Sequence, residues 1–187
     1  MPVLDEETPL FPPELFDAQL DPAVLHEKVW WVLHTKPRQE KSLARELIVR
    51  QVPFYLPQTQ KRSRVRGRVM TSHVPLFAGY LFLMADPQDR ITALTTNRIV
   101  NSIAVQDQAR LWNDLRQIHK LIATGAPVTP EDKLGPGDVV EIRSGSLMGL
   151  RGTILATATG RRFVVKVDFI QRGASVLIDD IALAPAS

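Results

Sequence analysis

Basic side chains are the most concentrated chemical feature of this chain. Five of the eight residues at positions 61–68 are basic, and Gly67 separates two arms of alternating character in the stretch KRSRVRGRVMTSH. Guanidinium and ammonium groups bind phosphate, so this pattern predicts a β-hairpin that contacts nucleic acid. The glycine would accept a positive φ at the hairpin tip. The alternative is an edge hairpin that its charge keeps soluble.

Catalytic chemistry has no comparable motif. The histidines His26, His34, His73 and His119 lack the spacing of metal ligands, and the chain contains neither cysteine nor a GxxxxGK[ST] phosphate loop. The adjacent carboxylates Asp179 and Asp180 have no histidine partner for acid–base work. We therefore expect a protein that is not an enzyme, with no catalytic residues, no metal and no cofactor.

The charge is unevenly distributed along the chain. Residues 1–27 carry seven acids and no Lys or Arg, residues 28–124 have a net charge of +10, and residues 125–187 are neutral, although the whole chain has only +3. This asymmetry indicates segments with different partners and makes the basic middle part the candidate nucleic-acid face. A solvated surface would give the same count.

The same composition bears on location. No run approaches the roughly 20 apolar residues of a membrane span. The N-terminal MPVLDEETPLF has acids where a secretion signal needs basic residues. Absence of cysteine fits a cytoplasmic protein. We expect a cytoplasmic monomer that does not bind membranes.

Alternating strand and helix patterns position the basic residues within a domain at residues 28–124. An α/β sandwich with a mainly antiparallel sheet is predicted, because the central hairpin requires antiparallel neighbours. The expected strands lie at 30–35, 75–83 and 99–105; the expected helices begin near Pro37, Asp86 and Asp107, and the last has Leu111, Leu115, Ile118 and Ile122 on one face.

The two ends of the chain differ from this domain. Residues 1–27 are expected to be a disordered acidic tail, with a short docking helix around Leu10, Phe11, Leu15 and Phe16 as the alternative. Residues 125–136 have the composition of a linker. Residues 137–187 contain short strand runs separated by glycines, which predicts a small β-barrel. The fold class is therefore α+β.

Two pairs of motifs resemble a known family. GDVVEI at 137–142 and GSLMGLRGTI at 145–154 resemble a KOW motif, and WWVLHTK at 30–36, with Glu40, and PLFAGYLF at 75–82 resemble the N-terminal domain of the NusG family. That second motif usually reads Pro-Leu-Phe-Pro-Gly-Tyr, so Ala78 replaces a proline. Leu56-Pro57 leading into the basic hairpin resembles the specialised RfaH-like paralogues more than housekeeping NusG.

The resemblance implies a bacterial transcription elongation and antitermination factor. The N-terminal domain of such factors binds the β′ clamp helices of RNA polymerase, spans the cleft towards the β subunit and suppresses pausing. The KOW domain of such factors is a five-stranded SH3-like β-barrel that recruits Rho or a small-subunit ribosomal protein. The rival interpretation is a ribosome-associated or RNA-binding KOW protein.

The resemblance also implies roles for particular residues. The polymerase contacts would be His34, Phe77, Tyr80 and Phe82; without the resemblance, burial of all four is favoured. Contacts with the non-template DNA strand and upstream DNA would come from Lys36, Arg38, Gln39 and Arg98, and from Lys61, Arg62, Arg64, Arg66 and Arg68 of the hairpin. The partner surface of the KOW domain would be Leu147, Phe169 and Ile170, with Leu150 in the barrel core.

Overall fold

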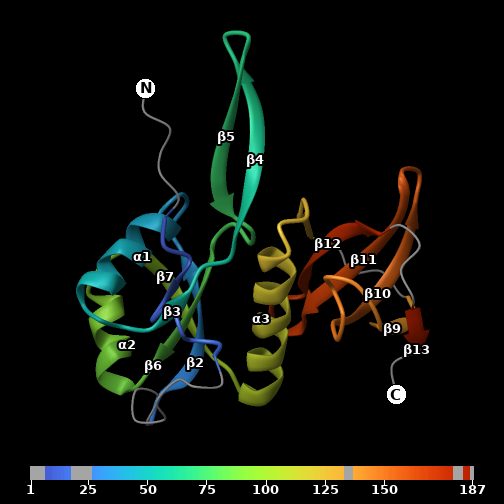
Figure 1. Ribbon diagram of the computed structural model, residues 1–187. Helices are drawn as coiled ribbons and strands as arrows, with labels where there is room; N and C mark the ends of the chain where they lie inside the picture. The colour runs from blue at the N-terminus through green and yellow to red at the C-terminus, as the bar shows by residue number, and fades with distance from the viewer. Residues whose placement is uncertain (1–6, 18–26, 133–136, 179–182, 186–187) are drawn as a thin grey trace. The chain divides into compact units, whose positions relative to one another are not determined.

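The computed structural model describes residues 7–17, 27–132, 137–178 and 183–185 (Figure 1). The chain divides into two compact units, Met1–Gln108 and Ala109–Ser187. The sequence places the division after residue 124, whereas here all but the first residue of helix α3 (Gln108–Ala123) belongs to the second unit. None of the helices in the described ranges is long and apolar enough to cross a membrane.

Strands and helices alternate in the first unit. Its elements are β1 (Leu10–Phe11), β2 (Val29–Thr35), α1 (Glu40–Val49), β3 (Phe54–Tyr55), β4 (Gln58–Val65), β5 (Arg68–Pro75), β6 (Tyr80–Ala85), α2 (Pro87–Leu94) and β7 (Ile99–Ala104). Helix α2 begins as its sequence predicts, because the Asp86 side chain accepts the N–H of Asp89 and Pro87 occupies the first turn.

Five strands of this unit form one sheet in the order β1-β3-β6-β2-β7. Every pairing in it is antiparallel, which confirms the expected mixture of helices and antiparallel sheet. β6 is the central strand of the sheet, and β2 lies between β6 and β7. His34, near the end of β2, lies opposite Tyr80 of β6 and Asn101 of β7.

Alternation along the central strands directs apolar side chains to both faces of the sheet. On one face Leu33, Leu81 and Leu83 pack with Leu43 and Leu47 of α1 in a single buried cluster. Each fully buried leucine contributes about 2 kcal/mol relative to exposure. Leu43 and Leu47 therefore lie on the face of α1 that covers the sheet.

The N-terminal segment belongs to this unit, which corrects the expectation of a disordered tail for residues 7–17. β1 extends the sheet, with Leu10 opposite Tyr55, and the N–H of Leu56 donates to the carbonyl of Pro9 at 2.6 Å. Prolines exclude a long helix but are compatible with a short edge strand followed by a turn. Residues 1–6 and 18–26 of the expected tail lie outside the described residues.

Phe16 anchors this segment on the second face of the sheet. Its ring lies 6.2 Å from that of Trp30 in a stacked arrangement and 4.9 Å from that of Tyr55 in an edge arrangement. Leu15 and Phe16 are both buried. Burial also raises the pKa of the Tyr55 hydroxyl above its ordinary value.

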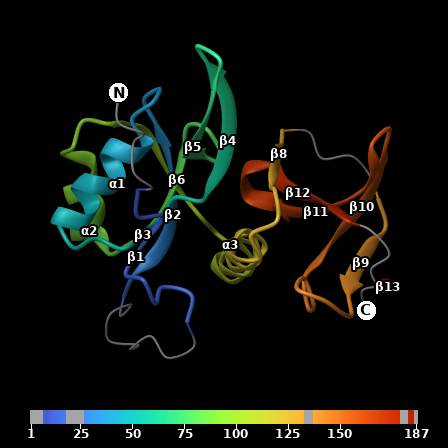
Figure 2. The same ribbon diagram turned by 45° about the horizontal axis from the view of Figure 1, so that its top comes forward.

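Strands β4 and β5 form a separate two-stranded sheet that projects from the rest of the first unit (Figure 1 and Figure 2). Val65 lies opposite Arg68, so Arg66 and Gly67 form a two-residue turn. Their φ angles are 51° and 80°, and two positive values are what a type I′ turn requires. The expected glycine at the hairpin tip is confirmed.

The second unit consists of α3 and a sheet in the order β13-β9-β10-β11-β12-β8. Its strands, with one short helix, are β8 (Thr129–Glu131), β9 (Val139–Ile142), β10 (Arg151–Thr157), β11 (Gly160–Val167), η2 (Asp168–Ile170), β12 (Arg172–Ile178) and β13 (Leu183–Pro185). Phe163, Val164 and Val165 are consecutive and all buried, so β11 is covered on both faces.

Strand β8 lies inside the segment expected to be a linker, and residues 129–131 are therefore part of the sheet. It pairs with β12, and Ser175 Oγ donates to Glu131 Oε1 at 2.5 Å while accepting from Arg162 Nε at 2.7 Å. Proline and glycine content suggested a linker here, but an edge strand tolerates proline because one side of its backbone needs no partner. Residues 133–136 lie outside the described part of the chain.

Strands β10 and β11 approach each other closely at Gly152. A Cβ atom at this position would lie 2.3 Å from the carbonyl oxygen of Val164 and 2.8 Å from the ring of Phe163. Any side chain would therefore push β10 away from β11. This contact is the physical reason for the last glycine of the KOW-like motif.

Phe16→Ala should lower the free energy of unfolding by about 3 kcal/mol, because it removes a buried ring between Trp30 and Tyr55. Thermal unfolding of the full chain measures the loss, with the exposed Glu14→Ala in the same segment as the matched control, expected to stay within about 0.5 kcal/mol. Equal stability of the two variants would show that the segment is not attached to the sheet.

Gly152→Ala should destabilise the second unit by about 3 kcal/mol because the added methyl group overlaps backbone. The control is Gly145→Ala, where φ is 83° but nothing lies within 4 Å of the added atom, and about 1 kcal/mol is expected from backbone strain alone. Differential scanning calorimetry compares the two, and losses of equal size would exclude the steric explanation.

Candidate functional site

An exposed aromatic pair stands where β2 ends and β6 begins. The rings of His34 and Tyr80 lie with centroids 5.5 Å apart and planes tilted by 30°. They are neighbours because the antiparallel register places these two residues opposite each other. His34 is exposed and Tyr80 is half-buried, so the pair presents both an edge and a face to a partner.

Gly79 holds this pair in position. Its φ of 83° lies in the left-handed region that glycine adopts without strain. Its carbonyl accepts the N–H of Thr35 at 2.9 Å, and its N–H donates to Glu40 Oε1 at 2.7 Å. The carboxylate of Glu40, only 6% exposed, therefore ties the start of β6 to the first turn of α1.

Basic residues surround the start of α1 next to the aromatic pair. The N–H of Lys36 donates to the carbonyl of Arg98 at 2.8 Å, and Lys36 Nζ donates to Asn97 Oδ1 at 3.0 Å. Arg38 is exposed and has a φ of 60°. The fold thus brings Lys36, Arg38 and Gln39 together with Arg98, as the sequence analysis expected. Asn97 was not expected there; its φ of 56° is one that asparagine tolerates.

Two members of this cluster hold each other. Arg98 Nη1 donates to Gln39 Oε1, and Arg98 Nη2 lies 3.7 Å from Glu46 Oε1. A hydrogen bond from Arg50 is the main cause that lowers the pKa of Glu46, with a smaller effect of Arg98. Lys36 and Arg38 are therefore more accessible to a phosphate than Arg98, which orients Gln39.

The hairpin carries its cations on both faces. All five cations are exposed. Strand alternation and the pairing of the two strands place Arg62 and Arg64 on one face and Lys61 and Arg68 on the other. Arg66 lies in the turn. Residues 58–75 contain no Asp or Glu, so no acid within the hairpin neutralises these charges. One nucleic-acid strand can contact only one face of the hairpin at a time.

Two of the expected polymerase contacts are buried, which corrects the interpretation of these rings as surface residues. Phe77 is 2% exposed and Phe82 is fully buried, and their rings meet edge to face at 6.4 Å. Phe82 lies on the same face of β6 as Tyr80. Strand alternation determines the face on which a side chain lies, but not how deeply the side chain is buried. The carbonyl of Phe77 accepts the N–H of Tyr80 at 3.0 Å, so these residues support the pair from behind.

The expected KOW partner residues also divide by burial. Phe169 is 38% exposed and Ile170 is half-buried, whereas Leu147 is 5% exposed and therefore packs inside the unit. The burial of Leu150 agrees with its expected core position. Met148, which the sequence analysis did not select, is 67% exposed in the same glycine-rich turn. Its signal was the position between two turn residues with positive φ, Gly145 and Gly149.

Metal chemistry has no candidate here: within the described ranges, no group of three or more His, Asp or Glu side chains is arranged to hold a metal ion.

Comparison with known proteins identifies the relatives of this chain. No curated protein sequence matches it. One similar solved structure concerns domain interaction in Thermotoga maritima NusG, with a TM-score of 0.47 and 17% identity over 82% of this chain and 94% of that one. A crystal structure of an MjSpt4:Spt5 complex gives a TM-score of 0.29 and 14% identity over 84% and 98%. Neither likeness is strong enough to bear on function.

The family comparison is decisive, because it covers more than half of the sequence. The family described as "NusG: Transcription termination factor nusG" matches residues 28–128. This chain therefore belongs to the NusG family, whose members are transcription factors and not enzymes, and a role in transcription elongation follows from that membership.

Proposed function

We propose that this protein is an elongation and antitermination factor that binds the β′ clamp helices of RNA polymerase through the His34–Tyr80 pair. The observation that carries the proposal is the exposure of this pair beside the basic start of α1. A polymerase partner is what membership of the NusG family suggests. Aromatic residues held rigidly at a surface are typical anchors of protein interfaces.

The docking surface is smaller than the one the sequence suggested. Phe77 and Phe82 act as supports, because a buried ring cannot contact a partner without unfolding its surroundings. Glu40 fixes the backbone at Gly79 and so limits the entropy that the pair loses on binding. With the rest of the unit spanning towards the β subunit, binding would favour the closed clamp and suppress pausing by population shift.

Nucleic-acid contacts are assigned to two places on the first unit. Lys36 and Arg38 lie at the start of α1, where backbone N–H groups also favour phosphate, and would face the non-template strand. The hairpin, about 26 Å long for strands of eight residues, would reach upstream DNA with Arg62 and Arg64 on one face. This basic hairpin, following Leu56-Pro57, is also the support for placing the chain among the RfaH-like paralogues.

The second unit is assigned the recruiting role. We infer that its sheet is an SH3-like KOW barrel, supported by the close crossing at Gly152 and by the burial of β11 on both faces. Phe169, Ile170 and Met148 are the accessible apolar residues that would meet Rho or a small-subunit ribosomal protein.

Replacing His34 and Tyr80 together by alanine should weaken polymerase binding about 30-fold, the loss expected for a central aromatic anchor. Affinity capture of bacterial RNA polymerase on the immobilised full chain measures it, with Val49→Ala as the control because Val49 is 80% exposed on α1, away from the pair. Wild-type affinity of the double variant would remove the assignment, and capture of ribosomal RNA in place of polymerase would favour the rival KOW interpretation.

Replacing Arg62 and Arg64 by glutamine should reduce the salt dependence of single-stranded DNA binding. Each phosphate contact contributes about 0.7 to the slope of log K against log salt, so losing two lowers the slope by about 1.4. Fluorescence anisotropy from low to high salt measures the slope. The control exchanges both arginines for lysine, which retains the charge and should retain most of the slope; an unchanged slope in the glutamine variant would place the hairpin away from DNA.

A further inference from the structure

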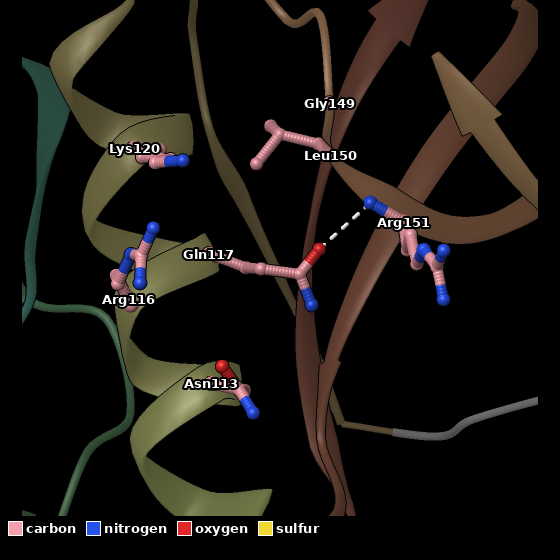
Figure 3. Close-up of a pocket in the computed structure, with 7 residues that line it drawn as sticks. All are labelled: Asn113, Arg116, Gln117, Lys120, Gly149, Leu150 and Arg151. Atoms are coloured by element: carbon pink, nitrogen blue, oxygen red, sulfur yellow. Dashed lines mark hydrogen bonds between the residues drawn. The ribbon is translucent and has the colours of Figure 1, made fainter.

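A cavity of about 410 Å³ lies in the second unit between α3 and the turn that leads into β10 (Figure 3). Its helix side is formed by Asn113, Arg116, Gln117 and Lys120, and its other side by residues 149–151. The volume is within the range of small-molecule sites, roughly 300–1,000 Å³. The Leu150 side chain extends towards the helix and closes one end (Figure 3).

The side chains that line this cavity carry only positive charge. Arg116 and Lys120 are one helical turn apart on the same face, both are exposed, and no carboxylate lines the cavity. Opposite them, Arg151 Nε lies 3.2 Å from Glu141 Oε2, but the same carboxylate also serves Arg143 at 3.3 Å. Like charges one turn apart repel each other, so this arrangement does not stabilise the helix.

The amide groups in the cavity are also oriented as donors. Gln117 Oε1 accepts the backbone N–H of Arg151 at 2.7 Å. This bond fixes the orientation of the amide, so that its NH₂ group is directed into the cavity (Figure 3). Asn113, one helical turn earlier, adds a second amide to the same wall. Glu141, which pairs with Arg151, is not among the residues that line the cavity, and the guanidinium, ammonium and amide donors together form an environment for an anion.

The nearby carboxylates make their contacts outside the cavity. Asp114 Oδ2 accepts the N–H of Asp168 at 3.0 Å, and Arg110 Nη2 lies 3.3 Å from Asp168 Oδ2. These contacts join α3 to the sheet along one stripe of the helix, whereas Arg116 and Lys120 lie beside that stripe. Asp114, the only acid within α3, therefore contacts the sheet and does not line the cavity.

We propose that this cavity binds a phosphate-bearing anion, with Arg116 and Lys120 holding one phosphate group while Gln117 and Arg151 orient it. Planar guanidinium groups match phosphate oxygens in pairs, and a cavity of this size accommodates two linked phosphates. The bound anion bridges α3 and β10, so its binding stabilises that contact. The site does not depend on polymerase binding, and either proposal can fail without the other.

Titration of the full, isotope-labelled chain with inorganic pyrophosphate tests the site, with chloride added to keep the ionic strength constant. The NMR signals of the Arg151 backbone amide and the Gln117 side-chain amide should shift in a saturable manner. Arg116→Gln with Lys120→Gln should weaken the affinity at least tenfold, since both positions are exposed and glutamine is a good helix former. Absence of these shifts, or equal affinity of variant and wild type, would overturn the proposal.

The matched control is Arg45→Gln in α1 with Arg50→Gln directly after it, where both arginines are exposed. It loses the same charge in the other unit and should bind pyrophosphate as wild type does. A reduced affinity in this control would mean that net charge alone attracts the anion, and would also overturn the site. A short single-stranded RNA distinguishes the natural sources. RNA that shifts the same signals and is displaced by pyrophosphate identifies a nucleic-acid backbone, whereas RNA that leaves them unshifted identifies a small phosphorylated molecule.

Discussion

A buried carboxylate at the start of α1 fixes the geometry on which the candidate surface depends. Glu40 accepts the N–H of Gly79, and the carbonyl of Gly79 accepts the N–H of Thr35. Without the carboxylate the half-buried N–H of Gly79 would lose its partner, and an intramolecular hydrogen bond contributes about 1 kcal/mol. One contact therefore joins three elements that are separate in the sequence: the end of β2, the first turn of α1 and the start of β6.

The same contact keeps the proposed docking surface rigid. Tyr80 is the first residue of β6, and its ring stays beside His34 because the glycine before it cannot move. Phe77 and Phe82 are buried and pack edge to face with each other, so they belong to the core of the unit and not to the accessible pair. A preorganised aromatic pair loses little rotamer freedom when it binds. The basic start of α1 adjoins this rigid point, which fixes the distance between the proposed protein contact and the proposed nucleic-acid contact.

The alternation along the strands and the residues of the turns were predictable from the sequence, whereas the degree of burial of each side chain was not. Alternation correctly places Tyr80 and Phe82 on one face, yet one is half-buried and the other fully buried, because burial depends on what covers each end of a strand. Phe16 shows no periodicity of its own, and its burial depends on Trp30 and Tyr55, which are distant in the chain. Arg98 could be grouped with Lys36 only through family resemblance, since no spacing rule connects residues so far apart.

The placement of acidic residues separates structural cations from available ones. Several arginines in the described part of the chain have a carboxylate within 4 Å, and these include Arg45, Arg50, Arg98, Arg110, Arg143, Arg151, Arg162 and Arg172. Exposed pairs of this kind contribute at most about 1 kcal/mol each. The hairpin and the pair Arg116–Lys120 lack acids beside them, and this small contribution to stability does not explain the difference. Unneutralised charge maintains a local potential that attracts phosphate. A count of charge by sequence segment does not reveal the basic surface of the second unit. Helix α3 lies in the basic middle part of the sequence, but in the structure it belongs to the second unit. Each unit therefore has its own basic surface, although residues 125–187 are neutral.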